Sequence, residues 1–215
     1  MRKIFLLTIL TTALFSVFNA NITPITPAIK DRMVKGNSWH KGCPVPLKNL
    51  RYISVKYHSF SGEDRVGELI VNKDIANSIV WVMEELYNIG YPIRQMRLVS
   101  DFNGDDWKSI EADNTSAFNC RKATGSTKWS RHSFGKAIDI NPIENPYISK
   151  RGHISHKKSL RYRKRVPNHR AVLLEDSLAT QIFKRHGFKW GGDWRYTKDY
   201  QHFFKWDIKL NPFKI

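Results

Sequence analysis

The sequence predicts a single α+β domain, and three observations indicate this class. An alternating segment at 52–57 and an apolar run at 68–71 indicate two paired strands. Apolar residues recur at helical spacing over 75–88 and again over 176–186. Strands and helices do not alternate regularly, which favours α+β over a parallel α/β architecture. A chain of 215 residues is long enough to bury a substantial core as one domain.

The first predicted strand has a clear two-residue period. Ile53, Val55 and Tyr57 fall on one face of the strand at 52–57. The following segment, 59–64, contains a glycine and reads as a turn. We therefore expect 68–71 to return as the partner strand.

The first predicted helix runs from Ile75 to Asn88. Asp74 precedes it as a candidate N-cap, and Gly90 follows it as a stop signal. Its apolar stripe consists of Ile75, Ile79, Val82, Met83 and Leu86. Such a stripe predicts one buried helix face.

Three further elements are expected later in the chain. A strand is predicted over 96–99 and a polar turn over 102–106. A second helix is predicted over 176–186, followed by Gly187. Its inward residues are expected to be Leu178, Ile182 and Phe183.

The N-terminus has the pattern of an export signal. Two basic residues precede an apolar stretch over 4–18, so we interpret 1–20 as a signal peptide. The alternative is an uncleaved membrane anchor, and either interpretation puts the body of the protein outside the cytoplasm, in the periplasm or beyond the cell. The proline-containing segment 21–40 reads as a linker, which leaves 41–215 as the catalytic domain.

The composition is strongly basic. There are 36 Lys and Arg against 19 Asp and Glu, a formal net charge of +17. This charge suggests an anionic partner such as nucleic acid, an acidic membrane surface or bacterial cell wall. Segment 150–170 carries nine Lys and Arg and no acid. It is either a solvated loop or a contact surface for an anionic polymer.

One segment combines residue types that bind metal. His132 and Asp139 offer an imidazole nitrogen and a carboxylate oxygen, both good zinc ligands. Gly135 between them permits a tight turn or a close backbone approach. Segment 135–140 then alternates as a strand, with the small Ala137 on the same face as Asp139. By itself, a His and Asp pair at this spacing is weak evidence for a metal site.

A second segment completes the set. His202 supplies a third candidate ligand, and Asp199 lies three residues before it. Three protein ligands and one open position are typical of a catalytic zinc, whose bound water becomes acidic near neutral pH. A carboxylate beside the metal can accept the proton of that water. The four residues therefore provide the parts for hydrolysis by a metal-activated water.

With both segments in view, the sequence resembles the zinc D-alanyl-D-alanine carboxypeptidase and L-alanyl-D-glutamate endopeptidase family of peptidoglycan hydrolases. The family patterns S-x-H-x-x-G-x-A-x-D and D/E-x-x-H occur in order at 130–139 and 199–202. The resemblance covers roughly 41 to 205. Further similar runs, typical of an extracellular bacterial subgroup, lie at 42–47, 112–121, 138–142 and 191–194.

The resemblance implies a fold, a cofactor and roles for individual residues. The expected fold is that of the hedgehog and D,D-peptidase group, an antiparallel sheet flanked by helices with the zinc cleft on the sheet. One zinc ion would be bound by His132, Asp139 and His202, with Asp199 as the general base. An arginine in the segment of Arg121 binds and polarises the substrate in this family, and a guanidinium suits a carboxylate or an oxyanion.

Several residues keep alternative interpretations. Arg121 could instead form a structural ion pair with Asp113 or Glu111. Ser130 and Trp194 are expected to contact substrate, although bulky aromatics such as Trp194 are more often core residues. Many relatives have Glu two residues after the final His, where this chain has Phe204. If that Glu orients the histidine in relatives, metal affinity here would be lower.

The two cysteines and the remaining histidines are also informative. Cys43 and Cys120 can form a disulfide in an oxidising compartment. The rival interpretation makes Cys120 a metal ligand. The histidines of the basic segment fit no recognised site and are interpreted as surface residues; they are His153, His156 and His169.

The sequence therefore predicts an exported, monomeric zinc peptidase that hydrolyses an amide bond in peptidoglycan stem peptides. Either a D-Ala-D-Ala carboxypeptidase or an L-Ala-D-Glu endopeptidase fits the motifs. The main alternative is a non-catalytic, zinc-containing module that binds cell wall on the same fold. A secreted nuclease, suggested by the charge, is disfavoured because no recognised nucleic-acid module is present. Expected partners are peptidoglycan and an anionic wall polymer, not nucleic acid.

Overall fold

The computed structural model describes residues 17–167 and 169–206. Its helices and strands are, in chain order, β1 (Ala20–Pro24), α1 (Pro27–Lys35), β2 (Leu50–His58), β3 (Asp64–Asn72), α2 (Ala76–Asn88), β4 (Gln95–Met96), α3 (Asp106–Glu111), β5 (Asn114–Thr115), β6 (Ala137–Asp139), β7 (Tyr147–Ile148), α4 (Leu178–Arg185), β8 (Lys189–Trp190), β9 (Lys198–Asp199) and β10 (His202–Phe204). Short 3₁₀ turns connect several of them. The predicted α+β class is confirmed.

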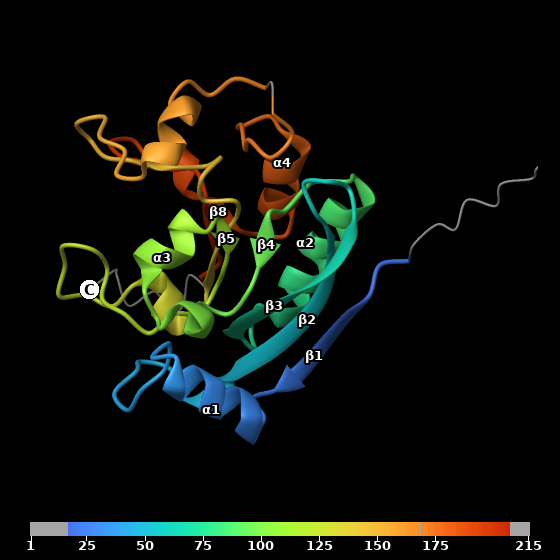
Figure 1. Cartoon of the computed structure of the whole chain (residues 1–215), viewed down its shortest axis with the longest axis vertical. Helices are drawn as coiled ribbons and strands as arrows, with labels where there is room; N and C mark the ends of the chain where they lie inside the picture. The colour runs from blue at the N-terminus through green and yellow to red at the C-terminus, as the bar shows by residue number, and fades with distance from the viewer. Residues whose placement is uncertain (1–16, 168, 207–215) are drawn as a thin grey trace, which may run out of the picture.

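The main sheet is antiparallel in the order β1-β2-β3. In Figure 1 it runs along one side of the molecule, with α2 beside it and α1 at its lower end. Ile53, Val55 and Tyr57 of β2 are all buried, in the core cluster that also contains residues of α2 and α4. The predicted face of this strand is therefore confirmed, and β3 is longer than the expected 68–71.

A second, smaller antiparallel sheet has the order β6-β10-β8. Its apolar residues Ile138, Phe203 and Trp190 join the same core cluster as α2, α4 and the main sheet. Phe203 stacks on Phe183 of α4 with ring centroids 3.8 Å apart. This packing fixes the small sheet, which carries the functional motifs, on the large hydrophobic core.

The stripe predicted for α2 is buried in full, but its cap is not the expected one. Asp74 forms an ion pair with Lys136 at 3.0 Å instead of capping the helix, and Ile75 is the N-cap residue. In α4, Ile182 and Phe183 are buried as expected, whereas Leu178 is 65 % exposed. Leu178 is the first helical residue, and Ser177 before it provides the cap.

Two expectations for the middle of the chain are wrong in detail. The strand expected over 96–99 is limited to β4, and a 3₁₀ turn begins at Val99. The polar turn expected over 102–106 is present at 103–104, but its last residue, Asp106, begins α3. Asp105 caps this helix by accepting a hydrogen bond from the Lys108 backbone at 3.1 Å.

The segment 21–40 is not a linker. It contains β1, which pairs with β2, and α1, which begins with Thr26 as N-cap and a proline at the first position. Met33 of α1 is fully buried in a second apolar cluster. Arg32 of α1 donates to Glu68 of β3 at 2.6 and 2.7 Å and to Asp101 at 2.7 and 2.8 Å.

The expected signal peptide lies mostly outside the described residues. Its last residue, Ala20, is the first residue of β1, and Phe18 packs against the main core. In the part of the chain that the structure describes, no helix combines the length and apolarity needed to cross a bilayer.

Candidate metal centre

His132 is held by the short 3₁₀ turn over Arg131–Phe134. The Ser130 hydroxyl caps this turn by accepting from the His132 backbone at 3.3 Å, and Gly135 ends it in the left-handed region at φ 65°. Nδ1 of His132 donates to the Ala117 carbonyl oxygen at 2.5 Å. This contact leaves Nε2 as the nitrogen that faces the cleft, the usual way in which a second hydrogen bond orients a ligating histidine.

Asp139 and His202 are brought together by strand pairing. They are direct partners in the register of β6 and β10. The backbone of Asp139 is fixed from its other side as well, through reciprocal hydrogen bonds with Ser116 at 2.8 and 3.0 Å. Side chains of directly opposed residues lie on the same face of a sheet, so the carboxylate and the imidazole project into the same space.

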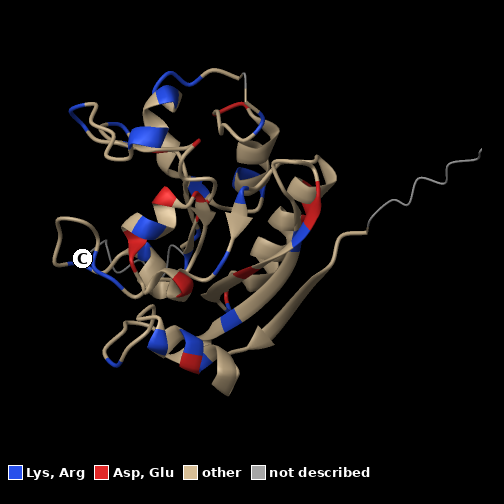
Figure 2. Cartoon of the chain, in the orientation of Figure 1, with Lys and Arg blue, Asp and Glu red and all other residues tan. Residues whose placement is uncertain are grey.

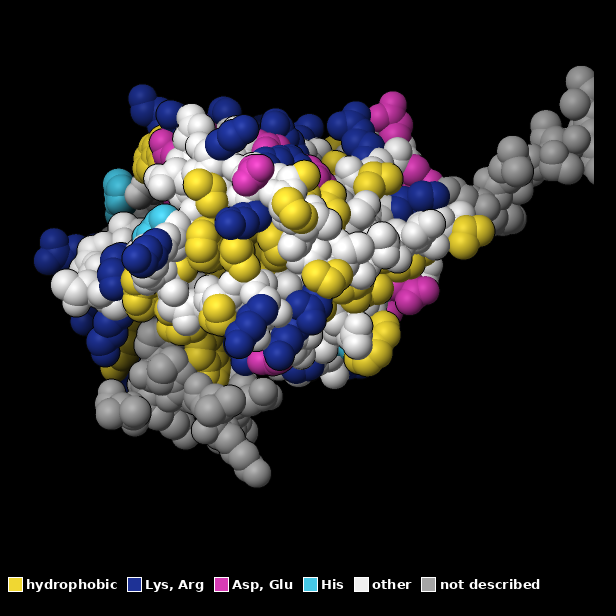
Figure 3. Space-filling view, turned by 90° about the horizontal axis from the view of Figure 1, so that it is seen from below, with side chains coloured by type: hydrophobic (Ala, Val, Ile, Leu, Met, Phe, Trp, Pro, Cys, Tyr) yellow, Lys and Arg dark blue, Asp and Glu magenta, His cyan; other side chains and the backbone are white. Residues whose placement is uncertain are grey.

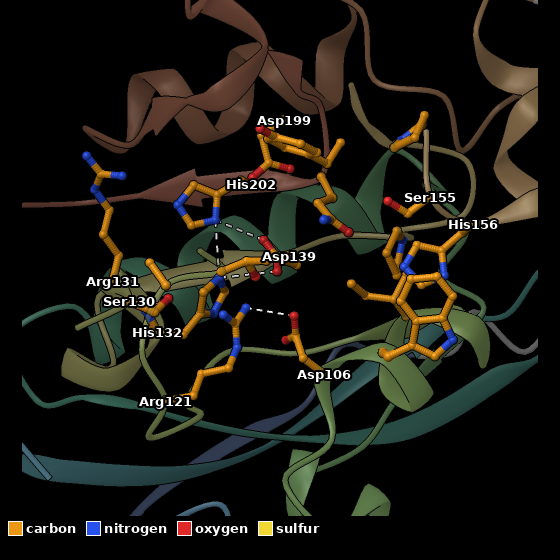
Figure 4. A pocket seen from close by; sticks show the side chains of 18 of the residues that line it. Asp106, Arg121, Ser130, Arg131, His132, Asp139, Ser155, His156, Asp199 and His202 are labelled. Atoms are coloured by element: carbon orange, nitrogen blue, oxygen red, sulfur yellow. Dashed lines mark hydrogen bonds and ion pairs between the residues drawn. The ribbon is translucent and has the colours of Figure 1, made fainter. Parts of the chain in front are cut away.

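The three side chains converge on one point. Nδ1 of His202 lies 2.9 Å from Asp139 Oδ1 and 3.2 Å from His132 Nε2, and His132 Nε2 lies 3.2 Å from Asp139 Oδ2. All candidate ligand atoms are within 4.8 Å of one another, and the three residues are buried (Figure 4). Two imidazole nitrogens and a carboxylate in a buried cluster form a donor set that suits zinc.

The electrostatics of two of the three residues, Asp139 and His202, agree with use as a cation site. Although burial opposes it, the two neighbouring imidazoles hold the pKa of Asp139 well below its usual range. Burial lowers the pKa of His202. An ionised carboxylate and a neutral imidazole are the forms that bind a metal.

Asp199 lies in the same cleft on β9, close to the three candidate ligands. Its Oδ1 atom is buried and has no hydrogen-bond partner among the described residues. Burial, and next the charge of Asp139, raise the pKa of Asp199 to about 8. The Gly191 backbone packs so tightly here that a Cβ atom would lie 2.8 Å from the Asp199 Cβ, which explains the glycine in the turn before Trp194.

Arg121 is anchored beside the metal cluster through its backbone. Its N–H donates to the Ser133 hydroxyl at 2.9 Å, and its carbonyl accepts from Ser130 and Ser133. Its guanidinium forms an ion pair with Asp106 of α3 at 2.7 Å. The pairing with Asp113 or Glu111 considered from the sequence is wrong, because those acids contact Arg94 and His156 instead.

A cleft of about 740 Å³ joins these residues. Ser130 and Trp194, expected to contact substrate, both line it, as does Trp129. Other walls come from α3, from β7 and from the segment after it, and include Trp107, Ile110, Tyr147, Ile154, Ser155, His156 and Ser159. A concave, largely apolar site with a few converging polar groups is the usual form of a small-ligand or peptide site.

One comparison with known proteins gives a match. A family model described as D-alanyl-D-alanine carboxypeptidase matches residues 124–205. No curated protein matches the chain, and no solved structure does.

The matched segment contains the three candidate ligands and Asp199, whereas Arg121 lies just before it. The match supports peptidase activity of the kind that acts on peptidoglycan. The mixed architecture with small antiparallel sheets is compatible with such a peptidase, and the hedgehog-type fold in detail stays a prediction.

Cys43 and Cys120 form a disulfide, with a sulfur–sulfur distance of 2.05 Å. His40 and these two cysteines also lie close enough together to suggest a metal group. Because both sulfurs are in the disulfide, neither is a thiolate, and the interpretation of Cys120 as a metal ligand is wrong. The bridge ties the segment before Arg121 to the loop after α1.

Phe204, where many relatives carry Glu, is buried in β10. The Arg131 guanidinium lies over its ring at 4.2 Å. An aromatic ring beneath an arginine provides a cation–π contact in place of an ion pair. In this chain the pairing of His202 with Asp139 in the register of β10 and β6 directs the imidazole into the cluster without a Glu at 204.

The sequence interpretation missed two cleft residues. His156 was expected at the surface, but its side chain is only 13 % exposed and its Nδ1 lies 2.6 Å from Glu111. Asp106 belongs to the segment expected to be a polar turn, and the sequence indicates no role for it. The acidic pair at 105–106 was the one local signal for the start of α3. Nothing in the neighbouring sequence shows which arginine Asp106 contacts.

Proposed function

We propose that the protein is an exported zinc-dependent peptidase that hydrolyses an amide bond in peptidoglycan stem peptides. The observation that carries the proposal is the buried cluster of His132, Asp139 and His202, with Asp199 in the same cleft. Export is supported by the disulfide, which persists in oxidising compartments.

His132, Asp139 and His202 would hold the zinc ion through two nitrogens and a carboxylate. When bound, zinc supplies Lewis-acid chemistry: it polarises an amide carbonyl and makes a water molecule acidic near neutral pH. The fit rests on the donor set and on the hydrogen bond to Ala117, which presents Nε2 of His132 to the site.

The other cleft residues handle protons and charge. In its ionised form, Asp199 accepts the proton of the attacking water and returns it to the leaving amine. Its Oδ1 has no hydrogen-bond partner among the described residues, so no neighbouring donor competes for this atom. Arg121 donates to the substrate carbonyl oxygen as negative charge develops on it. Trp129 and Trp194 form walls that exclude water from the cleft.

The decisive experiment is digestion of purified sacculi by the zinc-loaded protein, with and without a chelator. We expect free D-alanine or new amino termini, detected by mass spectrometry of the muropeptides, and their loss with chelator. The variant His132→Ala should bind less zinc and release no product. Intact muropeptides after incubation with protein of verified zinc content would reject the proposal.

A further inference from the structure

The charge of Arg121 is already balanced within the cleft. Asp106 lies 2.7 Å from its Nη2 atom, and the two side chains are only 25 % and 34 % exposed. Its Nη1 atom donates to the Lys122 carbonyl at 3.2 Å, and its Nε atom is buried without a partner in the described part of the chain. A substrate carboxylate would have to displace Asp106 and would meet its negative charge, whereas a neutral carbonyl can accept one N–H bond without displacing it.

The cleft also continues past this pair. Asp106 and Trp107 are consecutive in α3. Asp106 contacts Arg121, and Trp107 packs against His156 with ring centroids 3.9 Å apart and the rings tilted by 34°. Figure 4 shows Ser155 and His156 on the side of Asp106 away from the metal cluster. The pair therefore lies between the metal cluster and the far part of the cleft.

The far part of the cleft is firmly built. His156 is fixed by Glu111 at 2.6 Å, and Lys158 donates to the Glu111 carbonyl at 2.9 Å, so the segment after β7 is joined to α3. The Ser159 hydroxyl is buried and has no hydrogen-bond partner among the described residues. An unsatisfied hydroxyl in a preformed apolar wall provides a position where a peptide backbone group can bind.

We propose that Asp106 is the specificity-determining residue of the cleft: by neutralising Arg121 it selects a peptide bond with chain on both sides, and the Trp107–His156–Ser159 end binds the chain beyond that bond. The proposal rests on the proposed function and deepens it, since it favours cleavage within the stem peptide over removal of a terminal residue.

The test compares two peptides with zinc-loaded protein: L-Ala-γ-D-Glu-L-Lys-D-Ala-D-Ala with a free terminal carboxyl, and the same peptide as its terminal amide. We expect the kcat/KM values for the acid and the amide peptide to agree within about threefold, because the charge of the terminal carboxylate is remote from the internal bond that is cut. Asp106→Asn should raise the ratio of kcat/KM for the acid to kcat/KM for the amide about tenfold, because it leaves the charge of Arg121 free to bind the terminal carboxylate. Asp106→Glu restores the pair and should keep the wild-type ratio.

The matched control is Asp105→Asn, which keeps the cap of α3 and should leave the ratio unchanged. A wild-type preference for the acid above about tenfold, or an Asp106→Asn ratio equal to that of the wild type, overturns the inference.

If the wild type cuts neither these peptides nor sacculi, the proposed function fails. The inference about Asp106 is then tested separately, by the binding of the two peptides. Tryptophan fluorescence then reports titration with the acid and with the amide. Equal affinities for the two support the inference, whereas preference for the acid, or no binding of either, overturns it.

Discussion

In the proposed function, catalysis, as opposed to binding alone, depends on Asp199. A module that only binds cell wall needs no base in its cleft. We expect Asp199→Asn to lower kcat by about a thousandfold, since general-base catalysis contributes on that order, while zinc affinity changes little. The rate at which each protein hydrolyses muropeptides gives kcat, and the zinc content of the purified proteins, measured by mass spectrometry, reports metal binding.

Asp193→Asn is a suitable control for Asp199, because Asp193 is exposed and pairs with Lys184 at 3.0 Å. It should retain wild-type activity. Full biological effect of the Asp199→Asn protein would contradict the enzyme proposal and favour a binding module.

Asp113 gives the folded protein a pH-dependent stability. Burial, and next the neighbouring Glu144, raise the pKa of Asp113 to about 8. An unfolded aspartate has a pKa of about 3.9, so the folded chain keeps a proton that the unfolded chain releases. This contribution is fully present below about pH 4 and is lost as the pH rises through about 8.

Asp113→Asn removes that titration, and asparagine tolerates the left-handed conformation at φ 54°. Between pH 5 and pH 9, with chelator present, the melting temperature of the wild type should fall by at least about 3 °C more than that of the variant. Asp31→Asn, at an exposed position, should follow the wild type. Parallel pH profiles for Asp113→Asn and the wild type would refute this assignment.

At the scale of elements, Gly135 connects the turn that carries His132 to the main sheet. Its carbonyl accepts from the Asn72 backbone at the end of β3 at 2.8 Å. A Cβ atom at this position would lie 2.6 Å from the Asn72 nitrogen, in a residue with φ 65°. Both a left-handed turn and a close approach therefore require glycine here, as the sequence suggested.

Gly135→Ala should lower the free energy of unfolding by more than about 2 kcal/mol and weaken zinc binding, because the turn with His132 must move. Gly125→Ala separates the two causes: φ is 69° there as well, but nothing lies within 4 Å of the new Cβ atom. Only the left-handed cost of about 1–2 kcal/mol should remain. Urea unfolding measures both, and equal losses would contradict the argument from close approach.

What the sequence predicts well in this chain is what depends on local period or on spacing. The buried face of β2, the stripe of α2 and the approach of Asp139 to His202 follow from alternation, helical repeat and motif order. In contrast, α3 has only six residues, too few for a repeat, and was missed. The contact of Asp106 with Arg121 joins side chains that no local pattern relates.

The prediction that 21–40 is a linker was wrong for a similar reason. Its two prolines suggested a break, yet one occupies the first turn of α1 and the other ends β1 at the edge of the sheet. Both are positions that tolerate proline. Pairing with β2 is non-local, so the strand could be identified only with the sheet in view.

At the scale of the molecule, positive charge covers much of the surface. Figure 2 shows Lys and Arg on several helices and strands and on the loops at the upper left that follow β7. Figure 3 shows them around a band of apolar side chains on the face seen from below. A formal net charge of +17 attracts any polyanion over a distance set by ionic strength. The proposed affinity for an anionic wall polymer follows from this field.

The basic segment 150–170 is neither wholly a solvated loop nor wholly a contact surface. Arg165 points inward and donates to Asn145 and to the Leu173 carbonyl at 2.7 and 2.9 Å, and burial lowers its pKa to about 10. Lys150, Arg151 and Lys164 are exposed. Only such exposed cations can contact a polymer, so Arg165 must be left intact in any test of the segment.

Replacing Lys150, Arg151 and Lys164 by glutamine should reduce binding to sacculi at 150 mM salt by at least about threefold, measured by co-sedimentation. The matched control replaces Lys48, Lys73 and Lys189, which are exposed on other elements, and changes the net charge by the same amount. If the segment next to the cleft is the contact surface, the first triple variant loses more binding than the second. Equal losses would show that the overall field holds the protein on the wall, because only total charge would then matter.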